Sequence, residues 1–368
     1  MSSTNSYPIS KIIQTFELGK KEFSFAPFGS GHINDTFLVN GDGDQRHLLQ
    51  RINHEVFKDV DGLMHNMDKV TAYLRNSLDE EGNTHFTTVQ LIPTRKGDLY
   101  HQDEAGHYWR VQTFVPNSIT YDLVTTDEQA FQAGYAFGYF QKLLRDMPAD
   151  GLKETIPDFH NMETRIQKFL LMVDEDPVRR KDAVAKEIDF VLKRQVSMLD
   201  WYQLVKEEKL PRRITHNDTK FNNVLLDRET QRAICVIDLD TVMPGVVGYD
   251  FGDAIRTIVN TAEEDEADLT KIKVNLSFYQ AFARGFLGET GVFLTEAEIS
   301  HLAFSAHYMT FIMGLRFLTD YLEGDVYYKI QHPWHNIRRA RAQFSLVSQL
   351  EKHASQTEDI LGQLSKIK

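Results

Sequence analysis

Three oxygen-bearing side chains near the middle of the chain have types and spacing that suit phosphoryl transfer. Residues 216–223 read HNDTKFNN, so Asn223 follows Asp218 by five positions, and Asp238 ends a strand-like run twenty residues beyond Asp218. One carboxylate can accept the proton of an attacking hydroxyl, while an amide oxygen and a second carboxylate are ligands that Mg²⁺ prefers. Lys220 adds a cation that can face the charge on a departing phosphoryl group.

The same register occurs in protein kinases, where an Asp accepts the hydroxyl proton and an Asn and a later Asp hold the metal. Each piece alone is weak, because HxD occurs in many loops and an Asp at a strand end is often a turn former. Together they predict Asp218 and Lys220 as catalytic residues and Asn223 and Asp238 as metal ligands. The cofactors expected are ATP and Mg²⁺.

The chain resembles the aminoglycoside phosphotransferase and choline kinase superfamily in its HxDxxxxN motif. Longer segments are similar to the N-acetylhexosamine 1-kinases: GSGHINDTF (29–37), LLQRIN (48–53), HNDTKFNNVLLD (216–227), VIDLDTVMPG (236–245), YDFGDAIR (249–256) and GLRFLTDYLEGD (314–325). The resemblance runs through almost the whole chain. It implies phosphorylation of the anomeric hydroxyl of N-acetylglucosamine or N-acetylgalactosamine by in-line transfer.

A literal DFG at Asp250–Gly252 offers a second possible metal site. It lies thirty-two residues beyond Asp218, whereas Asp238 lies at the usual interval in kinase-like folds. The resemblance implies that Asp250 braces the catalytic loop. His216 has no nucleophile partner nearby in sequence, so we expect it to hold the backbone of that loop.

The N-terminal part alternates strand-like runs with turn residues. We expect strands at 23–28, 36–40, 47–52, 87–93 and 108–115, a helix at 59–74 and a hairpin at 96–98. Helical periodicity begins at Asp127, returns at 182–209 and resumes from about Leu269. The prediction is an α+β, bilobal, protein-kinase-like fold, with a small β-rich nucleotide-covering lobe (1–115) and a large helical catalytic and substrate-binding lobe (116–368).

The small lobe must cover the nucleotide, and the segment around Gly29 and Gly31 is the candidate, because glycines let backbone N–H groups approach phosphates. An ordinary hairpin turn is the alternative. His32 and Asn34 are further candidates for phosphate contact or loop positioning.

A kinase small lobe also carries a cation on its third strand. No Lys occurs there, so Arg51 is the predicted phosphate ligand, although its neighbour Gln50 points to the opposite face. The backbone between Thr113 and Val115 is the expected adenine contact. The two lobes should meet in this region.

Acceptor binding is expected in the helical lobe. Arg316 interrupts an apolar helix, and the resemblance favours its contact with sugar hydroxyls over an ion pair with Asp320. The segment 332–336 (HPWHN) is a possible binding loop or a turn. Asp240 follows Asp238 by two residues, on the same side if the run is extended, and is a candidate for metal or sugar contact.

The composition limits the classes of partner that we expect this protein to bind. The formal charge of −12, with 41 Lys and Arg against 53 Asp and Glu, argues against nucleic acid. The acidic run at 263–266 is most simply a solvated surface. No apolar stretch is long enough to cross a membrane, the N-terminus has no apolar leader, and the single Cys235 excludes an intramolecular disulfide. We expect a cytoplasmic protein with a small-molecule sugar partner.

Three other functions compete with this interpretation. A glycosidase needs two carboxylates, which Asp218 and Asp238 match in number, but Asn223, Lys220 and the glycine segment then have no role. A kinase for an amino alcohol or homoserine would keep the same catalytic residues. A nucleotide-binding pseudokinase should have lost the base or a metal ligand, and this chain retains all of them.

Overall fold

The chain divides into two compact units in the computed structural model, which describes residues 7–19, 22–29, 33–41 and 45–366. Unit 1 comprises Met1–Ile119, Asp150–Pro157 and Leu225–Met243, and unit 2 comprises Thr120–Ala149, Asp158–Val224 and Pro244–Lys368. The assignment of 1–115 as the nucleotide-covering lobe and of 116–368 as the catalytic and substrate-binding lobe stays a prediction.

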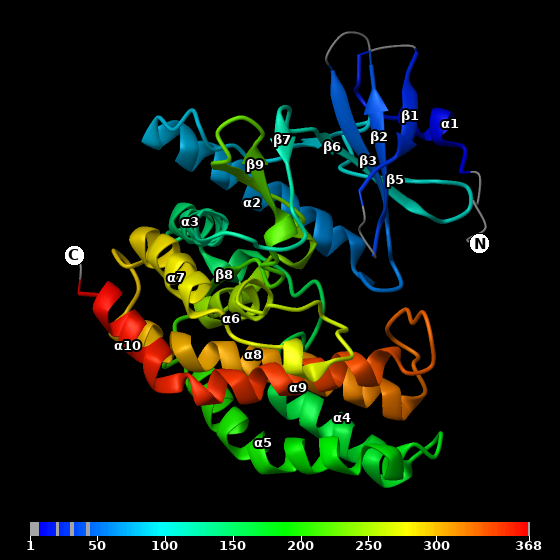
Figure 1. Cartoon of the computed structure of the whole chain (residues 1–368). Helices are drawn as coiled ribbons and strands as arrows, with labels where there is room; N and C mark the ends of the chain where they lie inside the picture. Colours follow the sequence, from blue (N-terminus) through cyan, green and yellow to red (C-terminus); the bar gives the residue numbers. More distant parts are fainter. Residues whose placement is uncertain (1–6, 20–21, 30–32, 42–44, 367–368) are drawn as a thin grey trace. The chain divides into compact units, whose positions relative to one another are not determined.

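An antiparallel sheet forms the centre of unit 1 (Figure 1), in the order β1-β2-β3-β6-β4 with β5 beside β6. Its strands are β1 (Ser24–Pro27), β2 (Asp35–Asn40), β3 (Arg46–Ile52), β4 (Leu91–Ile92), β5 (His101–Gln102) and β6 (Tyr108–Thr113). A turn does occur at 94–98, where Gly97 has φ 90°, but β4 and β5 both pair with β6 rather than with each other. A smaller sheet contains β7 (Ser118–Ile119), β9 (Val224–Asp227) and β10 (Ala233–Val236).

The main sheet buries different side chains on its two faces, because successive residues of a strand alternate. Leu49, Trp109 and Val111 pack with α1 (Ile9–Ile13) on one face. Ile52 packs with α2 (Val60–Glu81) on the other. This second helix starts at the predicted place but runs seven residues past the predicted end at 74, until Gly82 takes a left-handed φ of 64°.

Unit 2 is mostly helical. Its helices are α3 (Asp127–Leu143), α4 (Met162–Glu175), α5 (Ala185–Lys206), α6 (Val247–Ile258), α7 (Leu276–Thr290), α8 (Glu296–Glu323), α9 (His335–Lys352) and α10 (Ala354–Leu364). The helices predicted from Asp127 and within 182–209 are present, whereas α4 and α6 were not predicted. Strand β8 (Arg213–Thr215) pairs with β11 (Met243–Gly245).

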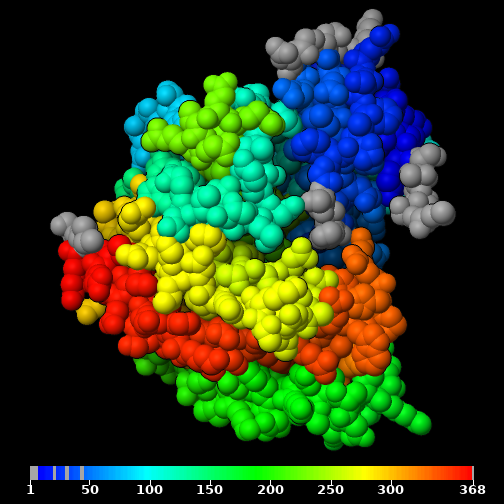
Figure 2. Space-filling model, in the orientation of Figure 1, coloured from blue at the N-terminus to red at the C-terminus, as the bar shows by residue number. Residues whose placement is uncertain are grey.

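The long helices α8 and α9 run side by side (Figure 1), and the C-terminal residues, red in Figure 2, cover one side of this unit. Glycines bring α3 and α7 into backbone contact: a Cβ on Gly134 would lie 2.1 Å from the carbonyl oxygen of Phe282. The sheet of unit 1 and the helices of unit 2 confirm the predicted α+β class. Among the described residues, none of the helices combines the length and the apolarity that a membrane span requires.

Candidate active site

The predicted catalytic loop, 216–223, follows β8 in unit 2. The ring of His216 is buried edge-on against Phe137 and Phe140 of α3, with both centroid separations at 5.8 Å. Its Nδ1 accepts a hydrogen bond of 3.3 Å from the backbone N–H of Asp218. His216 therefore lies against the helical core and contacts the loop backbone, and its role in holding the loop stays a prediction.

The carboxylate of Asp250 is the main anchor of this loop. Its Oδ1 accepts from the backbone N–H of Asn217 at 2.8 Å, and its Oδ2 accepts from that of His216 at 2.9 Å. Gln141 of α3 also donates to Oδ2, at 2.6 Å. Burial raises the pKa of Asp250, against the opposing effect of His216 and these hydrogen bonds. The anchor holds Asn217 in a left-handed conformation with φ 64°.

The literal DFG lies inside α6, and packing accounts for its glycine. A Cβ on Gly252 would lie 2.3 Å from the backbone oxygen of Ser305 in α8, so the two helices require glycine at this contact. Both oxygens of the buried Asp250 accept hydrogen bonds from the predicted catalytic loop, and Gly252 lies at the contact between α6 and α8. The contacts of this segment are therefore with the protein itself.

Asp218, Lys220 and Asn223 lie together at the end of the loop. Lys220 Nζ is 2.9 Å from Asp218 Oδ1, and the Asn223 amide donates to the backbone oxygen of Asp218 at 2.8 Å. Burial raises the pKa of Asp218, but the Lys220 ammonium, together with His216 and Arg256, lowers it more, so the pKa lies below its ordinary value. Conversely, Asp218 raises the pKa of Lys220. An ionised carboxylate thus faces a charged amine, while Asn223 keeps its amide oxygen for another ligand.

A second anchor of the loop was not predicted. Asp253 accepts a hydrogen bond of 2.9 Å from the backbone N–H of Thr219 and is itself paired with Arg256, three residues further along α6, at 2.9 Å. Arg256 also pairs with Glu264 at 2.9 Å. The interpretation of the acidic run as a solvated surface was therefore wrong: Glu264 belongs to this network, and Asp265 lies 3.2 Å from His335 of α9.

Two arginines of unit 2, Arg316 and Arg165, have no acidic ion-pair partner among the described residues. The guanidinium of Arg316 packs over the rings of Phe159, Tyr327 and Tyr328, at 5.0, 5.8 and 5.6 Å. Burial and then the charge of Arg316 lower the pKa of Arg165 to about 10.

The buried His160 responds to charges in both groups. Burial, then the charges of Arg316 and Arg165, hold its pKa well below the ordinary value, while Asp218 acts in the opposite sense.

The alternative partner of Arg316 is engaged elsewhere. Asp320 accepts from the backbone N–H groups of Tyr327 at 2.8 Å and Tyr328 at 3.0 Å, and from the side chain of Asn336 at 2.8 Å. Asp320 therefore anchors the segment whose Tyr327 and Tyr328 rings lie against Arg316, in place of the alternative ion pair with Arg316. Within 332–336, Trp334 remains 60% exposed.

In unit 1, Asp238 and Asp240 do not lie on one side of an extended run, contrary to the sequence argument. Asp238 has φ 61° and is exposed, and a 3-10 turn over Leu239–Thr241 buries Asp240. Asp240 Oδ1 accepts from Arg110 at 2.5 Å, and Oδ2 accepts from Asn34 at 2.6 Å. Each oxygen of the buried Asp240 therefore accepts from a protein donor, whereas Asp238 is exposed.

Arg51, the predicted phosphate cation, lies on the face of the sheet that carries α1. Its Nε pairs with Asp35 Oδ2 at 2.7 Å, and its guanidinium packs over Tyr7 at 5.4 Å. Gln50, on the opposite face, accepts from Arg110 at 2.9 and 2.8 Å. Sequence reasoning missed Arg110, because its partner on β3 is sixty residues away and only the strand pairing brings them together.

Of the glycine segment, Gly29 is described and has φ 77°, while Gly31 and His32 lie outside the described residues. Asn34 accepts from the backbone N–H of Asn53 at 2.9 Å in addition to donating to Asp240. It therefore ties the end of this segment to β3 and to the turn after Asp238.

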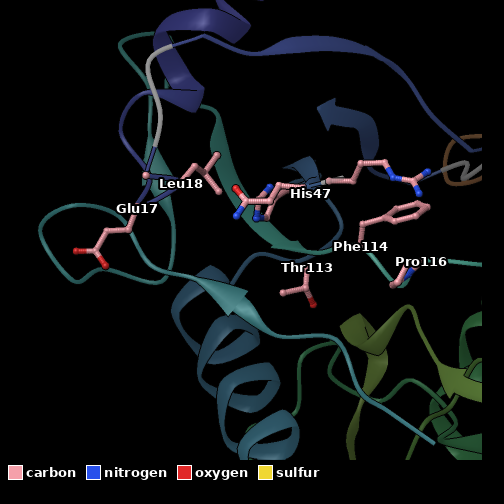
Figure 3. A pocket seen from close by; sticks show the side chains of 9 residues that line it. Glu17, Leu18, His47, Thr113, Phe114 and Pro116 are labelled. Carbon is pink, nitrogen blue, oxygen red and sulfur yellow. The ribbon is translucent and has the colours of Figure 1, made fainter. Parts of the chain in front are cut away.

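In the expected adenine contact, Thr113 to Val115, some backbone and side-chain polar groups already make hydrogen bonds within the protein. Thr113 exchanges hydrogen bonds with the backbone of Gln90, and the Val115 carbonyl accepts from Ser118 at 2.8 Å. A hollow of about 500 Å³ lies beside this segment (Figure 3), lined by Glu17, Leu18, Gly19, Gln45, Arg46, His47, Thr113, Phe114 and Pro116. Asp238 and Asn34 are not among its lining residues, so the hollow does not locate the phosphates.

The two predicted metal ligands both carry hard oxygens: a carboxylate in Asp238 of unit 1 and an amide oxygen in Asn223 of unit 2. Magnesium is commonly held by one or two such protein ligands together with substrate phosphates and water. No cluster of three or more His, Cys, Asp or Glu suited to a self-sufficient metal site occurs in the described ranges. The chemistry of each residue by itself suits a magnesium ion that is bound together with a nucleotide.

Comparison with known proteins gives the same fold. A microcompartment-associated aminopropanol kinase is similar with a TM-score of 0.65 and 16% identity, over 95% of this chain and 98% of that one. An aminoglycoside phosphotransferase from Alicyclobacillus acidocaldarius matches with 0.57 and 13%, over 99% and 97%. Choline kinase from Cryptosporidium parvum matches with 0.57 and 14%, over 96% and 98%.

At these identities the neighbours show the fold alone, and that fold is the predicted bilobal, kinase-like one. The phosphotransferase enzyme family has a sequence model that matches residues 24–286, which include the catalytic loop, Asp238 and Asp250. The match spans well over half of the chain, and the chain belongs to the phosphotransferase enzyme family.

Proposed function

We propose that this phosphotransferase is an ATP- and Mg²⁺-dependent kinase that phosphorylates the anomeric hydroxyl of an N-acetylhexosamine, giving the sugar 1-phosphate in the cytoplasm. The observation that carries the acceptor assignment is the group around Arg316. Its guanidinium is ringed by Phe159, Tyr327 and Tyr328, in the same unit as Asp218. Aromatic faces and a planar multiple donor suit a sugar ring with hydroxyl and amide oxygens.

The positive charges of Arg316 and Arg165 disfavour the main alternative acceptor, an amino alcohol. An ammonium about 6 Å from one guanidinium is repelled by roughly 3 kcal/mol at an effective dielectric constant of about 20. Arg165 adds a second cation, and its pKa is lowered first by burial and then by the charge of Arg316. A choline-type site would instead place carboxylates or uncharged aromatic faces at this position. The pair therefore favours an acceptor without positive charge.

The proposed mechanism is direct in-line transfer. Asp218, held ionised by Lys220, orients the acceptor hydroxyl and accepts its proton late, since a loose transition state needs little activation of the nucleophile. Lys220 offsets charge on the transferred group. Asn223 and Asp238 would hold Mg²⁺, which when bound neutralises the phosphate oxygens. The anchors at Asp250 and Asp253 fix the backbone on which Asp218 and Lys220 are presented.

The test is ATP consumption with and without Mg²⁺ against N-acetylglucosamine, N-acetylgalactosamine, glucose, galactose, choline, aminopropanol and homoserine. ³¹P NMR of the product locates the new phosphate. A 1-phosphate on an N-acetylhexosamine supports the proposal, and Asp218→Asn should bind ATP but lose turnover by several orders of magnitude. Turnover with an amino alcohol or homoserine alone would overturn the acceptor assignment. ATP binding without turnover on any acceptor would favour a pseudokinase.

A further inference from the structure

A buried polar network in unit 1 surrounds Asp240 and has no place in the mechanism above. Arg110 is 1% exposed and Asp240 is 2% exposed, and their ion pair is 2.5 Å long. The same guanidinium donates twice to Gln50, its cross-strand partner. Arg110 is thus held as a fork between a strand of the main sheet and the turn that follows Asp238.

The cost of such a pair makes its presence informative. Burying two ions usually gives little or no net stability compared with apolar side chains of the same volume. The pair joins the end of the glycine segment, through Asn34, to the segment that carries Asp238. It also lies on the sheet face opposite to Arg51, the cation that sequence reasoning had placed at the phosphates.

The turn itself has a conformation that needs support. Asp238 has a left-handed φ of 61°, which residues other than glycine adopt at some energetic cost. The residues that follow it are held in place: Arg110 and Asn34 hold Asp240, and Asn66 of α2 donates to the carbonyl of Val242 at 2.9 Å. Within residues 238–242, Asp238 is exposed and the other four are buried.

We propose that Arg110 is a positioning residue for the metal site: by clamping Asp240 it fixes the strained turn that aims the Asp238 carboxylate at Mg²⁺. A cation on β6 thereby helps to arrange the nucleotide site, as a lysine on the third strand does in protein kinases. This inference rests on the proposed function only in its use of ATP and Mg²⁺, and the acceptor plays no part in it.

The experiment measures the affinity for ATP by calorimetry, in Mg²⁺ and in EDTA, for the wild type and for Arg110→Met, Arg110→Lys and Arg194→Met. The last variant removes an ion pair with Glu351 in unit 2 and is the matched control. Loss of a residue that orients a metal ligand typically weakens metal binding about 10- to 100-fold. Arg110→Met should therefore lose about tenfold or more of the Mg²⁺-dependent affinity and keep its affinity in EDTA, with partial recovery in Arg110→Lys.

The double variant Arg110→Met/Asp240→Leu separates positioning from stability. Removing both buried ions should restore thermal stability relative to Arg110→Met, because no unpaired charge remains. The Mg²⁺-dependent affinity should stay low, since the turn is no longer clamped. Recovery of that affinity together with stability would overturn the proposal in favour of a purely structural pair.

Two further results would also overturn it. An equal loss of affinity in EDTA would make Arg110 a direct phosphate ligand, and an unchanged response to Mg²⁺ would remove it from the metal site. If the wild type itself binds ATP no better with Mg²⁺ than with EDTA, the proposed function fails instead, so the two failures can be told apart.

Discussion

Replacing Asp250 by Asn tests whether the catalytic loop is braced by a carboxylate. Each carboxylate oxygen accepts from one backbone N–H of the loop, so the amide nitrogen of Asn must face a donor whichever way it turns. The less damaging orientation keeps the oxygen toward His216 and Gln141 and leaves the Asn217 N–H unsatisfied.

The magnitude follows from these contacts. A lost hydrogen bond to a charged group is worth about 1.5–3 kcal/mol, and the stranded buried N–H costs about 1–3 kcal/mol more. The lower desolvation cost of a neutral amide offsets part of this. We expect Asp250→Asn to lower the free energy of unfolding by about 3 kcal/mol, and to reduce turnover because Asp218 sits on the loosened backbone.

Urea unfolding monitored by tryptophan fluorescence is the assay, because the buried Trp201 packs near Tyr249, the neighbour of Asp250. The matched control is Asp189→Asn, the same chemical change at an exposed helical position, where about 0.5 kcal/mol or less is expected. A fully stable Asp250→Asn protein whose only defect is a raised Mg²⁺ requirement would refute the brace and return the literal DFG to the metal site.

Three further outcomes follow from the site. Lys220→Met removes the cation that lowers the pKa of Asp218, so this pKa should rise and the acid limb of the pH profile of kcat/KM should move to higher pH. An unchanged acid limb would show that Lys220 does not control the protonation of Asp218. Gly252→Ala forces a Cβ to 2.3 Å from the Ser305 oxygen and should cost about 1–3 kcal/mol of stability in urea unfolding, whereas Gly288→Ala, with open space, should not destabilise. Arg316→Met should raise KM for the N-acetylhexosamine at least about tenfold, by loss of about 1.4 kcal/mol or more of binding, with KM for ATP unchanged; equal rises in both would argue for a folding defect.

The sequence was most informative where chemistry depends on local spacing. Asp218, Lys220 and Asn223 lie within six residues of one another, so a single loop brings them together. The strands at 36–40 and 47–52 were predictable from their alternation and flanking turns. The class of the fold followed from the change to helical periodicity at Asp127.

What the sequence could not supply depends on contacts between distant segments. Arg110 meets Gln50 only because β3 and β6 are neighbours, and Asp253 meets Thr219 only because α6 packs under the loop. The extended geometry assumed for 238–240 failed because a left-handed residue followed by a 3-10 turn gives little signal in residue type. The acidic run looked solvated because its partners, Arg256 and His335, come from two different helices.

The anchoring of the segment after α8 has an evolutionary consequence. Asp320 holds this segment through the backbone N–H groups of Tyr327 and Tyr328, and these contacts do not depend on the identity of either side chain. Both residues can therefore be exchanged while the path of the chain is preserved. Under the proposed function, a protein built in this way can acquire new acceptor preferences by single substitutions at the segment, without first rebuilding its helices.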